Sequence, residues 1–426
     1  MLKSIILAAG KGTRMKSETP KVLHTIFDKT LVGYVIDAVN NTDFIDENFI
    51  IVGHQAERVE EYIAKNYNNA KTVLQSPQLG TGHAVSMVLP HLKDFSGDVV
   101  ILCGDTPLIT SETLKEFVNF HKEKGSDLTV MSAIYDNPTN YGRIIRNEDG
   151  TLNSIVEEKD ASIEQKAIKE VNAGIYCLNW GKIKSAFGEL KTNNAQGEYY
   201  LTDIIKWANE QGLKADAYIL KNNEEIFGIN SKAHLAEATK IMNSRVIQKH
   251  LDNGVTIVDP ATTWISPETT IEADTVIYPS CYINGKNTIG KNCKIGPFAH
   301  LRGDVVLEDN VKIGNFVEVK KTTIKSNTNA CHLTYLGDSE IGSNVNIGAG
   351  TITANYNPLT KVKNKTIIKD NVKVGSNSVL VAPVTIEEGA NVAALGCITK
   401  DVPAWALAIT RAPLKVLENW VTKFLH

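Results

Sequence analysis

The sequence predicts two folded parts: an α/β layer built on a mostly parallel sheet, followed by a parallel β-helix. Two observations lead to this prediction. Strand-like and helix-like segments alternate through residues 1–228, which is typical of an α/β layer. From Ile265 onward an aliphatic residue returns at every sixth position, a period that belongs to neither an α-helix nor an alternating strand.

Length and composition agree with two folded parts. The chain has 426 residues, of which 42% are hydrophobic, enough for sizeable cores. Its formal charge of −3 argues against nucleic acid or a membrane surface as a partner. No apolar run approaches ~20 residues, so we expect neither membrane insertion nor export. The six cysteines form no C-x-x-C pair, which favours reduced thiols in a cytoplasmic protein.

The α/β part is read from its apolar runs. We expect strands at 3–9, 47–54, 97–105, 126–135, 170–179 and 224–229, and helices at 31–41 and 111–124. A helical pattern then runs through 231–254 and predicts a connecting helix. The expected domains are 1–228, a linker helix at 229–250, and 251–426 with a short C-terminal tail. Within that tail, 414–424 has the pattern of a short amphipathic helix.

The six-residue period predicts which side chains point into the β-helix. Three repeats of six close one coil of 18 residues, and stacked coils bury one another's edges. A small or β-branched residue follows most of the aliphatic ones after four positions, up to Val317 and Thr323. The expected inward aliphatic positions are 265, 271, 277, 283, 289, 295, 301, 307, 313 and 319, then 341 and 347, then 368, 374, 380, 386, 392 and 398.

Two cations stack on this scaffold. Arg302 and Lys320 are 18 residues apart, so they occupy the same place on successive coils, about 4.8 Å apart. Like charges facing each other across strands are unfavourable. Either both side chains splay into solvent, or they hold an anion such as a phosphate, which removes the repulsion.

A histidine appears where the six-residue beat slips. The beat moves from 319 to 324, 330 and 336, then slips again to 341 and 347. His332 should therefore lie over Ala349 and outside the core. A lone turn histidine is usually just solvated, but the loop 354–365 interrupts the repeat nearby and is long for a coil corner. An imidazole beside cationic anchors suits deprotonation of an amine.

The N-terminal part carries features of a phosphate site. In LAAGKGTRM, residues 7–15, Gly10 and Gly12 let backbone amides approach a phosphate, and Lys11 and Arg14 add charge. The stretch is neither a P-loop nor a complete dinucleotide fingerprint. Asp105 follows an apolar strand, where open α/β sheets bind ligands. Together with Asn230 it could hold a magnesium ion whose other ligands are substrate phosphates.

Twelve strings in order give the chain a family resemblance. They are LAAGKGTRM, PKVLH, QLGTGHA, GDTPLI, YGRI, EEKDA, NAGIY, NAQGEYYLTDII, NFVEVKK, HLTYLGD, NVNIGAGTITANY and LVAPVTI. Over essentially its whole length the chain resembles the bifunctional N-acetylglucosamine-1-phosphate uridylyltransferases/glucosamine-1-phosphate N-acetyltransferases. The resemblance implies a Rossmann-like nucleotidyltransferase domain and a left-handed β-helix of hexapeptide repeats, which together make UDP-N-acetylglucosamine, a cell-wall precursor.

For the N-terminal part the resemblance implies transfer of UMP from UTP to N-acetylglucosamine 1-phosphate, with release of pyrophosphate and help from Mg²⁺. Asp105 and Asn230 would bind the metal, and Arg14 and Lys21 would stabilise the triphosphate. The other implied nucleotide and sugar positions are Leu7, Ala8, Ala9, Gly10, Gln75, Gly80, Thr81, Gly104, Gly142, Glu157 and Asn172.

For the β-helix the resemblance implies acetylation of glucosamine 1-phosphate by acetyl-coenzyme A, with His332 as general base. Cys331 beside it is expected to be a turn residue rather than a nucleophile. Sugar-phosphate contacts are implied for Arg302, Lys320, Tyr335 and Asn346, an acyl-site contact for Ala349, and coenzyme A contacts for Asn355, Tyr356, Ser376, Ala394 and Arg411. The resemblance also implies a homotrimer.

Several features differ from the family's usual pattern. The loop NYNPLTKVKNKT is about two residues longer than usual, so its substrate-contacting lysine is either Lys361 or Lys363. HLRGD lacks the proline often found after the arginine, and FDKTLVGYVID departs from the usual start of that helix. Two alternatives compete with the bifunctional enzyme. One is a sugar-1-phosphate nucleotidylyltransferase whose β-helix is purely structural or regulatory, and the other is a non-enzymatic regulatory subunit.

Overall fold

The structure, a computed structural model, describes residues 2–425. It divides into two compact units, residues 1–241 and 242–426. Helix α8 (Lys232–Asp252) contains the point of division. No helix within the described chain is long and apolar enough to cross a membrane.

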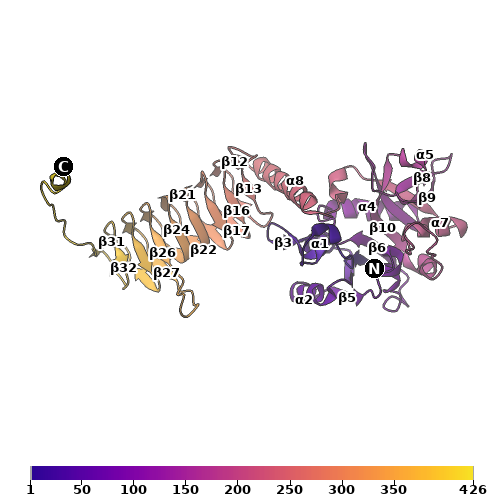
Figure 1. The fold of residues 1–426 in the computed structure, drawn as a ribbon, viewed down its shortest axis with the longest axis horizontal. Coiled ribbons are helices and arrows are strands. Elements are labelled where there is room, and N and C mark those ends of the chain that lie inside the picture. The colour runs from indigo at the N-terminus through magenta and orange to yellow at the C-terminus, as the bar shows by residue number, and fades with distance from the viewer. Residues whose placement is uncertain (1, 426) are drawn as a thin grey trace. The chain divides into compact units, whose positions relative to one another are not determined.

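Unit 1 is an α/β layer around a mixed, mostly parallel sheet (Figure 1). Strand β10 runs antiparallel to both β6 and β7, whereas the remaining neighbours along the main path are parallel. The path, in spatial order, is β11 (Ala215–Ile219), β7 (Leu128–Ile134), β10 (Glu170–Asn179), β6 (Asp98–Cys103), β1 (Leu2–Leu7), β4 (Ile45–Val52) and β5 (Ala70–Leu74); the hairpin β8 (Arg143–Arg146) and β9 (Leu152–Val156) joins through β10.

Helices cover both faces of this sheet. Successive residues of β1 point to opposite faces, so Ile5 and Ile6 belong to two different buried clusters, one on each side. The helices of unit 1 are α1 (Leu31–Asn40), α2 (Ala56–Asn66), α3 (Thr81–Ser86), α4 (Ser111–Lys124), α5 (Ile163–Lys166), α6 (Trp180–Ile183) and α7 (Asp203–Glu210); 3-10 turns are η1 (Thr13–Met15), η2 (Lys21–Leu23), η3 (Lys184–Gly188) and η4 (Asn223–Ile226), and a small ribbon pairs β2 (Thr25–Ile26) with β3 (Lys29–Thr30).

The strand expected at 224–229 was wrong, because the 3-10 turn η4 ends at Ile226 and residues 227–229 are irregular. The apolar residues of this segment fit the pattern of a strand, but Glu225 is buried and its carboxylate accepts hydrogen bonds from distant residues. One carboxylate oxygen accepts from the backbone N–H and the hydroxyl of Thr110, both at 3.0 Å, and the other accepts from Thr113 at 2.9 Å. A tertiary hydrogen-bond network therefore overrides the local pattern.

Unit 2 is the predicted left-handed parallel β-helix, and its short strands stack from one coil to the next (Figure 1). The inward aliphatic positions predicted from the sequence are buried in one continuous core. One prism face consists of β12 (Thr256–Ile257), β15 (Val276–Ile277), β18 (Lys294–Ile295), β21 (Lys312–Asn315), β23 (Asn329–His332), β25 (Asn346–Ile347), β28 (Lys373–Val374), β31 (Asn391–Val392) and β33 (Leu407–Ala408).

The other two faces share long strands at the centre of the prism. The second face contains β13 (Trp264–Ile265), β16 (Tyr282–Asn284), β19 (His300–Arg302), β26 (Ile352–Ala354), β29 (Val379–Val381) and β32 (Cys397–Ile398). The third contains β14 (Thr270–Ile271), β17 (Asn287–Ile289), β20 (Val305–Leu307), β27 (Thr366–Ile368) and β30 (Val384–Ile386). Strands β22 (Glu318–Ile324) and β24 (Tyr335–Ile341) continue from the second face into the third.

The register confirms the slip of the six-residue beat. Val319 pairs with Leu336, and Ile324 pairs with Ile341, so this coil is one residue short of 18. Shortening moves the small inward position from Thr323, where the sequence placed it, to Thr322, which is buried. The loop that follows β26 projects from the stack in Figure 1, as its break in the repeat predicts.

The tail does not form the amphipathic helix expected at 414–424. Only the 3-10 turn η5 (Val421–Phe424) is present, and the apolar side chains from Leu414 to Leu425 are exposed. A short helix is marginal without a surface to pack on, and no described residue covers this one.

Candidate functional site

A hollow of about 420 Å³ opens at the carboxyl ends of β1 and β6 in unit 1. It brings together residues from five sequence segments: the stretch after β1, the 3-10 turn η2, the stretch from Gln75 into α3, the end of β6, and the stretch before α7 that contains Glu198. Of the residues predicted for the nucleotide site, those that line it are Leu7, Ala8, Ala9, Gly10, Lys21, Gln75, Gly80, Thr81 and Asp105. The hollow thus unites most of a set that the sequence scatters over about a hundred positions.

Gly12 allows the glycine-containing loop after β1 to pack against Lys21. Its φ is +61°, and a Cβ there would lie 2.6 Å from the Cβ of Lys21. A larger residue would therefore push the loop away from the lysine. Glycine at this position lets the backbone after β1 approach the hollow closely.

Lys21 joins the two residues predicted to bind magnesium. Its Nζ forms an ion pair with the carboxylate of Asp105 and lies 3.2 Å from Oδ1 of Asn230. Both side chains of the ion pair are mostly buried. Two side-chain oxygens from distant parts of the sequence therefore converge on one positive charge.

This donor set fits magnesium. A carboxylate oxygen and an amide oxygen are hard ligands, and they already surround a cation. Within the described chain no group of three or more His, Cys, Asp or Glu side chains could hold a metal ion. A magnesium ion at Asp105 and Asn230 would thus take its remaining ligands from substrate phosphates and water.

The turn before α3 is held by buried amides. Gln75 is buried, and its Nε2 donates to the carbonyl oxygen of Gly80 at 3.0 Å. The same Nε2 lies 3.1 Å from Nδ1 of His83. The hydroxyl of Thr81 accepts from the backbone N–H of Leu201 at 3.0 Å. These bonds keep the turn rigid against one side of the hollow.

Gly142, Glu157 and Asn172 form a second group, away from the lining residues of the hollow. The backbone N–H of Asn172 donates to the carbonyl oxygen of Gly142 at 2.9 Å, and a Cβ at Gly142 would touch the Glu157 carboxylate. Burial raises the pKa of Glu157, although Thr202 donates to its carboxylate at 3.3 Å. The three residues predicted for the sugar therefore do come together.

Two predicted residues lie elsewhere, and several unforeseen ones line the hollow. Arg14 is exposed and forms no ion pair within residues 2–425, and Gly104 is buried behind the lining, donating its N–H to the carbonyl oxygen of Leu7 at 2.9 Å. Sequence reasoning did not assign Gln78, whose Nε2 donates to the carbonyl oxygen of Ala9 at 3.0 Å. Lys11, which the sequence analysis expected to add charge at this loop, also lines the hollow, and the other lining residues left unassigned are Val22, Ala84, Cys103 and Glu198. The motifs PKVLH, QLGTGHA and NAQGEYYLTDII contain all of these unassigned residues except Cys103.

In unit 2, one corner of the prism carries His332. Asn315 pairs with His332 on the coil before it, and His332 accepts at its carbonyl oxygen from the N–H of Gly350 at 3.3 Å. Each following coil repeats the bond, from Asn377 to Ala349 at 2.7 Å and from Leu395 to Ser376 at 2.8 Å. The equivalent positions on successive coils are therefore Asn315, His332, Ala349, Ser376 and Ala394.

We call these five positions the corner line. All of them except Asn315 are predicted site residues. The backbone N–H groups of Ala349, Ser376 and Ala394 form no hydrogen bond within the described chain. Arg411 reaches the same line, since its Nη1 lies 3.5 Å from the carbonyl oxygen of Ala394. Free donors spaced one coil apart suit a long, extended ligand lying along the corner.

A cluster of cations lies on the adjacent face. Arg302 and Lys320 sit on successive coils, as the sequence predicts, and Glu318 binds Arg302 at 2.6 Å. Lys363 stands beside Lys320, and its charge, together with burial and Arg302, lowers the pKa of Lys320. Of the two loop lysines, it is therefore Lys363 that joins the stacked cations.

The remaining predicted acetyl-site residues divide into two groups. Asn355 donates to the hydroxyl of Tyr335 at 3.4 Å and to the carboxylate of Asp338. Tyr356 is exposed and forms a backbone bridge with Lys363. Asn346 does not join them, because it lies on β25 on the first prism face, between Asn329 and Lys373.

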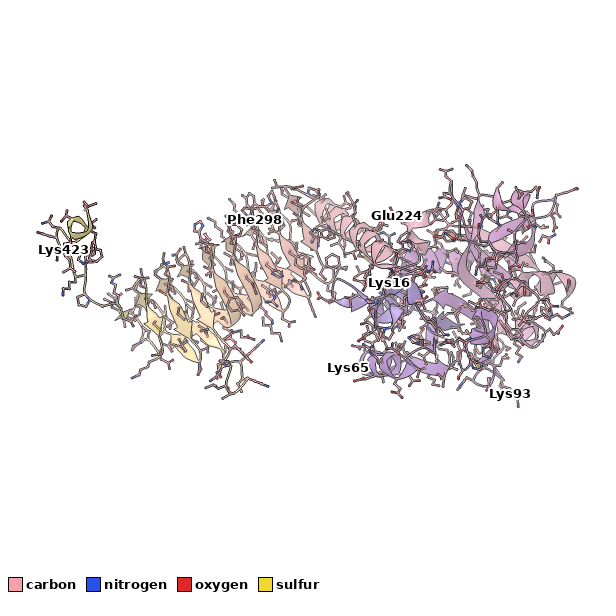
Figure 2. All side chains as sticks on the ribbon, viewed as in Figure 1. Lys16, Lys65, Lys93, Glu224, Phe298 and Lys423 are labelled. Carbon is pink, nitrogen blue, oxygen red and sulfur yellow. The ribbon has the colours of Figure 1, made fainter. Side chains whose placement is uncertain are left out.

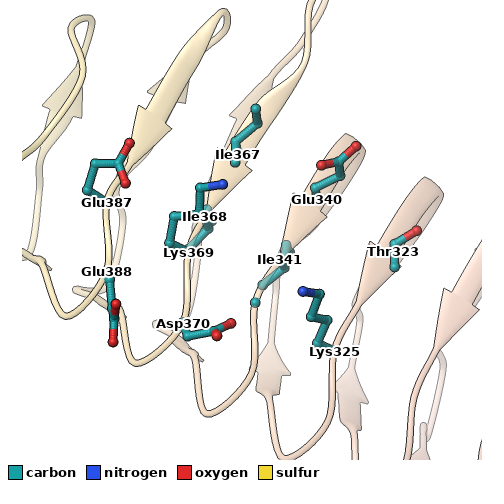
Figure 3. A pocket seen from close by; sticks show the side chains of 11 residues that line it. Thr323, Lys325, Glu340, Ile341, Ile367, Ile368, Lys369, Asp370, Glu387 and Glu388 are labelled. Atoms are coloured by element: carbon teal, nitrogen blue, oxygen red, sulfur yellow. The ribbon is translucent and has the colours of Figure 1, made fainter. Parts of the chain in front are cut away.

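Figure 3 shows another hollow, of about 580 Å³, on the third prism face and its corner. Lys325 and Lys369 line it together with Glu340, Asp370 and Glu387. Charges of both signs alternate there, and no residue predicted for either activity is among its lining residues. It is therefore separate from the corner line.

Comparison with known proteins gives the class and then the family. A family model described as nucleotidyl transferase matches residues 3–258, and one described as bacterial transferase hexapeptide (six repeats) matches residues 288–321. The bifunctional protein GlmU of Acetivibrio thermocellus is 45% identical over 455 aligned residues, covering 99% of this chain and 97% of the relative. The GlmU proteins of Thermoanaerobacter pseudethanolicus and Clostridioides difficile are 46% and 44% identical, with the same coverage.

Fold and sites define a two-part transferase, in which a nucleotidyltransferase unit precedes a hexapeptide-repeat unit. The chain belongs to the family of bifunctional GlmU proteins. As a member of that family it is an enzyme with uridylyltransferase and glucosamine-1-phosphate acetyltransferase activities.

Neighbouring glutamates should affect stability in opposite directions. Glu157 has a raised pKa because it is buried, so its stabilising, protonated form is lost as pH rises through that pKa. Glu158 instead pairs at 2.7 Å with Arg143, whose side chain is only 2% exposed. We expect Glu157→Gln to raise the melting temperature of unit 1 by about 2 °C or more at pH 8 and much less at pH 4.

Glu158→Gln is the matched control. It leaves the buried Arg143 guanidinium without its counter-charge and should destabilise unit 1 by roughly 3 kcal/mol. Scanning calorimetry of both variants at the two pH values measures the difference. Equal destabilisation by both substitutions at pH 8 would show that the Glu157 carboxylate is not penalised by burial.

Proposed function

We propose that residues 1–228 transfer UMP from UTP to N-acetylglucosamine 1-phosphate, and that residues 251–426 acetylate glucosamine 1-phosphate with acetyl-coenzyme A. Residues 229–250 would be the linker between them. The observation that carries the proposal is the clustering of the predicted residues: nine line one hollow in unit 1, and four share one corner line in unit 2. Together the two reactions would produce UDP-N-acetylglucosamine.

In the first reaction, the phosphate oxygen of the acceptor sugar attacks the α-phosphorus of UTP, and the bond to pyrophosphate breaks. Gln75, Gly80 and Thr81 are positioned to face the uracil, because their turn is rigid and lies at the hollow. Gly142, Glu157 and Asn172 would hold the acceptor's acetamide and hydroxyls. Leu7, Ala8, Ala9, Gly10 and Gly104 would shape the nucleotide side through their backbone.

Charge stabilisation in this reaction falls to Lys21 and Arg14. Lys21 is already held at the hollow by Asp105, so it can meet a triphosphate oxygen without reorganisation. Arg14 is exposed and would have to turn toward the substrate. Magnesium, when bound by Asp105 and Asn230, would neutralise charge on the phosphates. The Lys21 ammonium would balance charge on the leaving pyrophosphate.

In the second reaction, His332 takes a proton from the amine of glucosamine 1-phosphate as the amine nitrogen attacks the thioester carbonyl. The carbon–sulfur bond breaks, and the coenzyme leaves as a thiol. Acetyl-coenzyme A would lie along the corner line, with Ala349 at the acyl group and Ser376, Ala394 and Arg411 farther along. Asn346, Asn355 and Tyr356 would complete the sugar and coenzyme contacts. No cysteine participates, so both substrates are bound at once.

The phosphate of glucosamine 1-phosphate would sit among Arg302, Lys320 and Lys363. Lys320 has a lowered pKa because of its cationic neighbours, so an anion placed there relieves repulsion that the free protein carries. Tyr335 follows Glu318 on the next coil of the same face. With the phosphate among these cations, the Tyr335 hydroxyl would lie within reach of the sugar ring.

The alternative, a β-helix with a structural or regulatory role alone, accounts poorly for these side chains. A prism needs inward aliphatic residues and tight corners, but it gains nothing from three clustered cations or from unused backbone donors along a corner. Membership of the bifunctional family points the same way. We also propose a cytoplasmic location, where UTP and acetyl-coenzyme A are available.

The two activities should separate by single substitutions. Asp105→Ala should abolish pyrophosphate release, because it removes a metal ligand and the partner of Lys21, while acetyl transfer stays within twofold of the original. His332→Gln should lower acetyl transfer by about 10²-fold or more and spare pyrophosphate release. A coupled assay of thiol and pyrophosphate measures both, and loss of both activities in either folded variant contradicts the division.

The loop lysines provide a sharper test of the phosphate site. Lys363→Met should raise the KM for glucosamine 1-phosphate about tenfold, because it removes one of three charges facing the phosphate. Lys361→Met is the matched control: the same loop and the same change, but no described contact with Lys320. Its KM should change less than twofold. A larger increase in KM for Lys361→Met than for Lys363→Met would contradict a phosphate site at the stacked cations.

We further propose a homotrimer whose subunits meet at an apolar ridge beside the corner line. The ridge consists of Phe298, Phe316 and Leu333, one per coil, with exposures of 51%, 55% and 64%. Phe298 is labelled in Figure 2. The phenyl rings stack with centroids 5.2 Å apart. All three residues have φ near +50°, an unfavourable conformation for large side chains, which argues that their outward position is used.

Phe298→Glu should disrupt this assembly. A buried carboxylate at the contact would convert trimers into smaller species, which sedimentation would detect, and should lower acetyl transfer, because the corner line lies beside the proposed contact. Uridylyl transfer should persist. Unchanged sedimentation at micromolar concentration would exclude the ridge as the contact.

A further inference from the structure

Asn315 carries a buried polar atom without a partner. It is the last residue of β21, and its side-chain oxygen Oδ1 is buried and forms no hydrogen bond within residues 2–425. Buried amide oxygens are nearly always satisfied, so an unsatisfied one in a functional region calls for a cause. The six-residue period does not require an asparagine here.

The nearest equivalent position on the next coil is His332. Strands β21 and β23 are parallel and in register, with Asn315 opposite His332, and the N–H of Leu333 donates to the carbonyl oxygen of Asn315 at 2.9 Å. Side chains paired in this way lie on the same side, with backbones about 4.8 Å apart. Asn315 is therefore the neighbour of the imidazole on the side away from Ala349.

The imidazole of His332 also lacks a partner. His332 is exposed, and its side chain forms no hydrogen bond within the described chain. A histidine acting as a base needs one ring nitrogen free for the proton and the other held as N–H by an acceptor, which sets the tautomer. One coil away, Asn315 offers an acceptor that nothing else uses.

We propose that Asn315 is the positioning residue of His332, accepting from Nδ1–H so that Nε2 faces the substrate amine. This inference rests on the proposed role of His332 as the acetyltransferase base. Small rotations about the side-chain bonds bring the two groups together, because their backbones are already one strand spacing apart. The bond stabilises the imidazolium that forms during the reaction and keeps the ring from turning.

Glu318 is the competing candidate for this role. It is a carboxylate on the adjacent face, but it already binds Arg302 at 2.6 Å and is bound to that cation rather than free. Other charged or titratable groups on the strands around His332 are Cys331 on its own strand, Lys312 on β21, and Lys320 and Tyr335 across the corner. Of these, none is an unused neutral acceptor at the position paired with His332.

The test is the pH dependence of kcat/KM for acetyl transfer by the full chain. Asn315→Asp places a carboxylate against the imidazole and should move the acidic limb upward by about one pH unit or more. Asn391→Asp, on an exposed position of the same prism face, is the charge-matched control and should leave the limb in place. Asn315→Leu should lower kcat about 10-fold with the KM for glucosamine 1-phosphate within twofold.

Each outcome decides between causes. An unmoved acidic limb in Asn315→Asp overturns the proposal, as does a limb that moves only in Glu318→Gln. Melting temperatures identify a variant that fails through misfolding, in which case the KM and the limb of Asn315→Ser replace those of Asn315→Leu. If His332→Gln keeps full acetyl transfer, it is the role of His332, and not the role of Asn315 alone, that fails.

Discussion

In-register stacking of coils is the constraint on which the β-helix and its site depend. Each coil presents its inward aliphatic residue directly over that of the coil before, and the backbone hydrogen bonds then repeat at every level. Because this ladder is rigid, the place of each projecting side chain follows from the residue's position in the repeat. Arg302 stands beside Lys320, and His332 stands between Asn315 and Ala349, for the same reason that Ile313 stands beneath Ala330. The functional groups inherit their spacing from the packing of the core.

In the nucleotidyltransferase unit the candidate site is assembled in a different way. Its site residues are far apart in sequence, and the sheet gathers them because parallel strands end at a common edge. There the decisive interaction is electrostatic: the ammonium of Lys21 is held between the carboxylate of Asp105 and the amide of Asn230. In the β-helix like charges gather instead: Lys363 and Arg302 lie close enough to Lys320 to lower its pKa, although Glu318 pairs with Arg302. One candidate site therefore holds its lysine in an ion pair, whereas the other places Lys320 beside further cations.

Prediction from sequence succeeded where a period or a motif acts locally. The inward column of the β-helix, the slip near residue 320 and most of the lining of the hollow in unit 1 were all accessible in this way. It failed at 224–229, where buried Glu225 binds Thr110 and Thr113 from more than a hundred residues away. It also failed at 414–424, whose amphipathic pattern has no surface to pack on in the described chain. Neither Lys361 nor Lys363 could be preferred from sequence, because both sit in a loop outside the repeat.

The sequence by itself determined the two architectures and the identity of most candidate residues, because hydrophobic period and glycine-rich turns are properties of contiguous chain. Tertiary structure alone decided which of those residues meet. It joined Lys363 to Lys320, brought Gly142, Glu157 and Asn172 together, kept Asn346 on another face, and left the Asn315 amide beside His332 without a partner. The physical reason is that contact between distant residues depends on register and on desolvation of charge, and both are set only when the strands have paired and the coils have stacked.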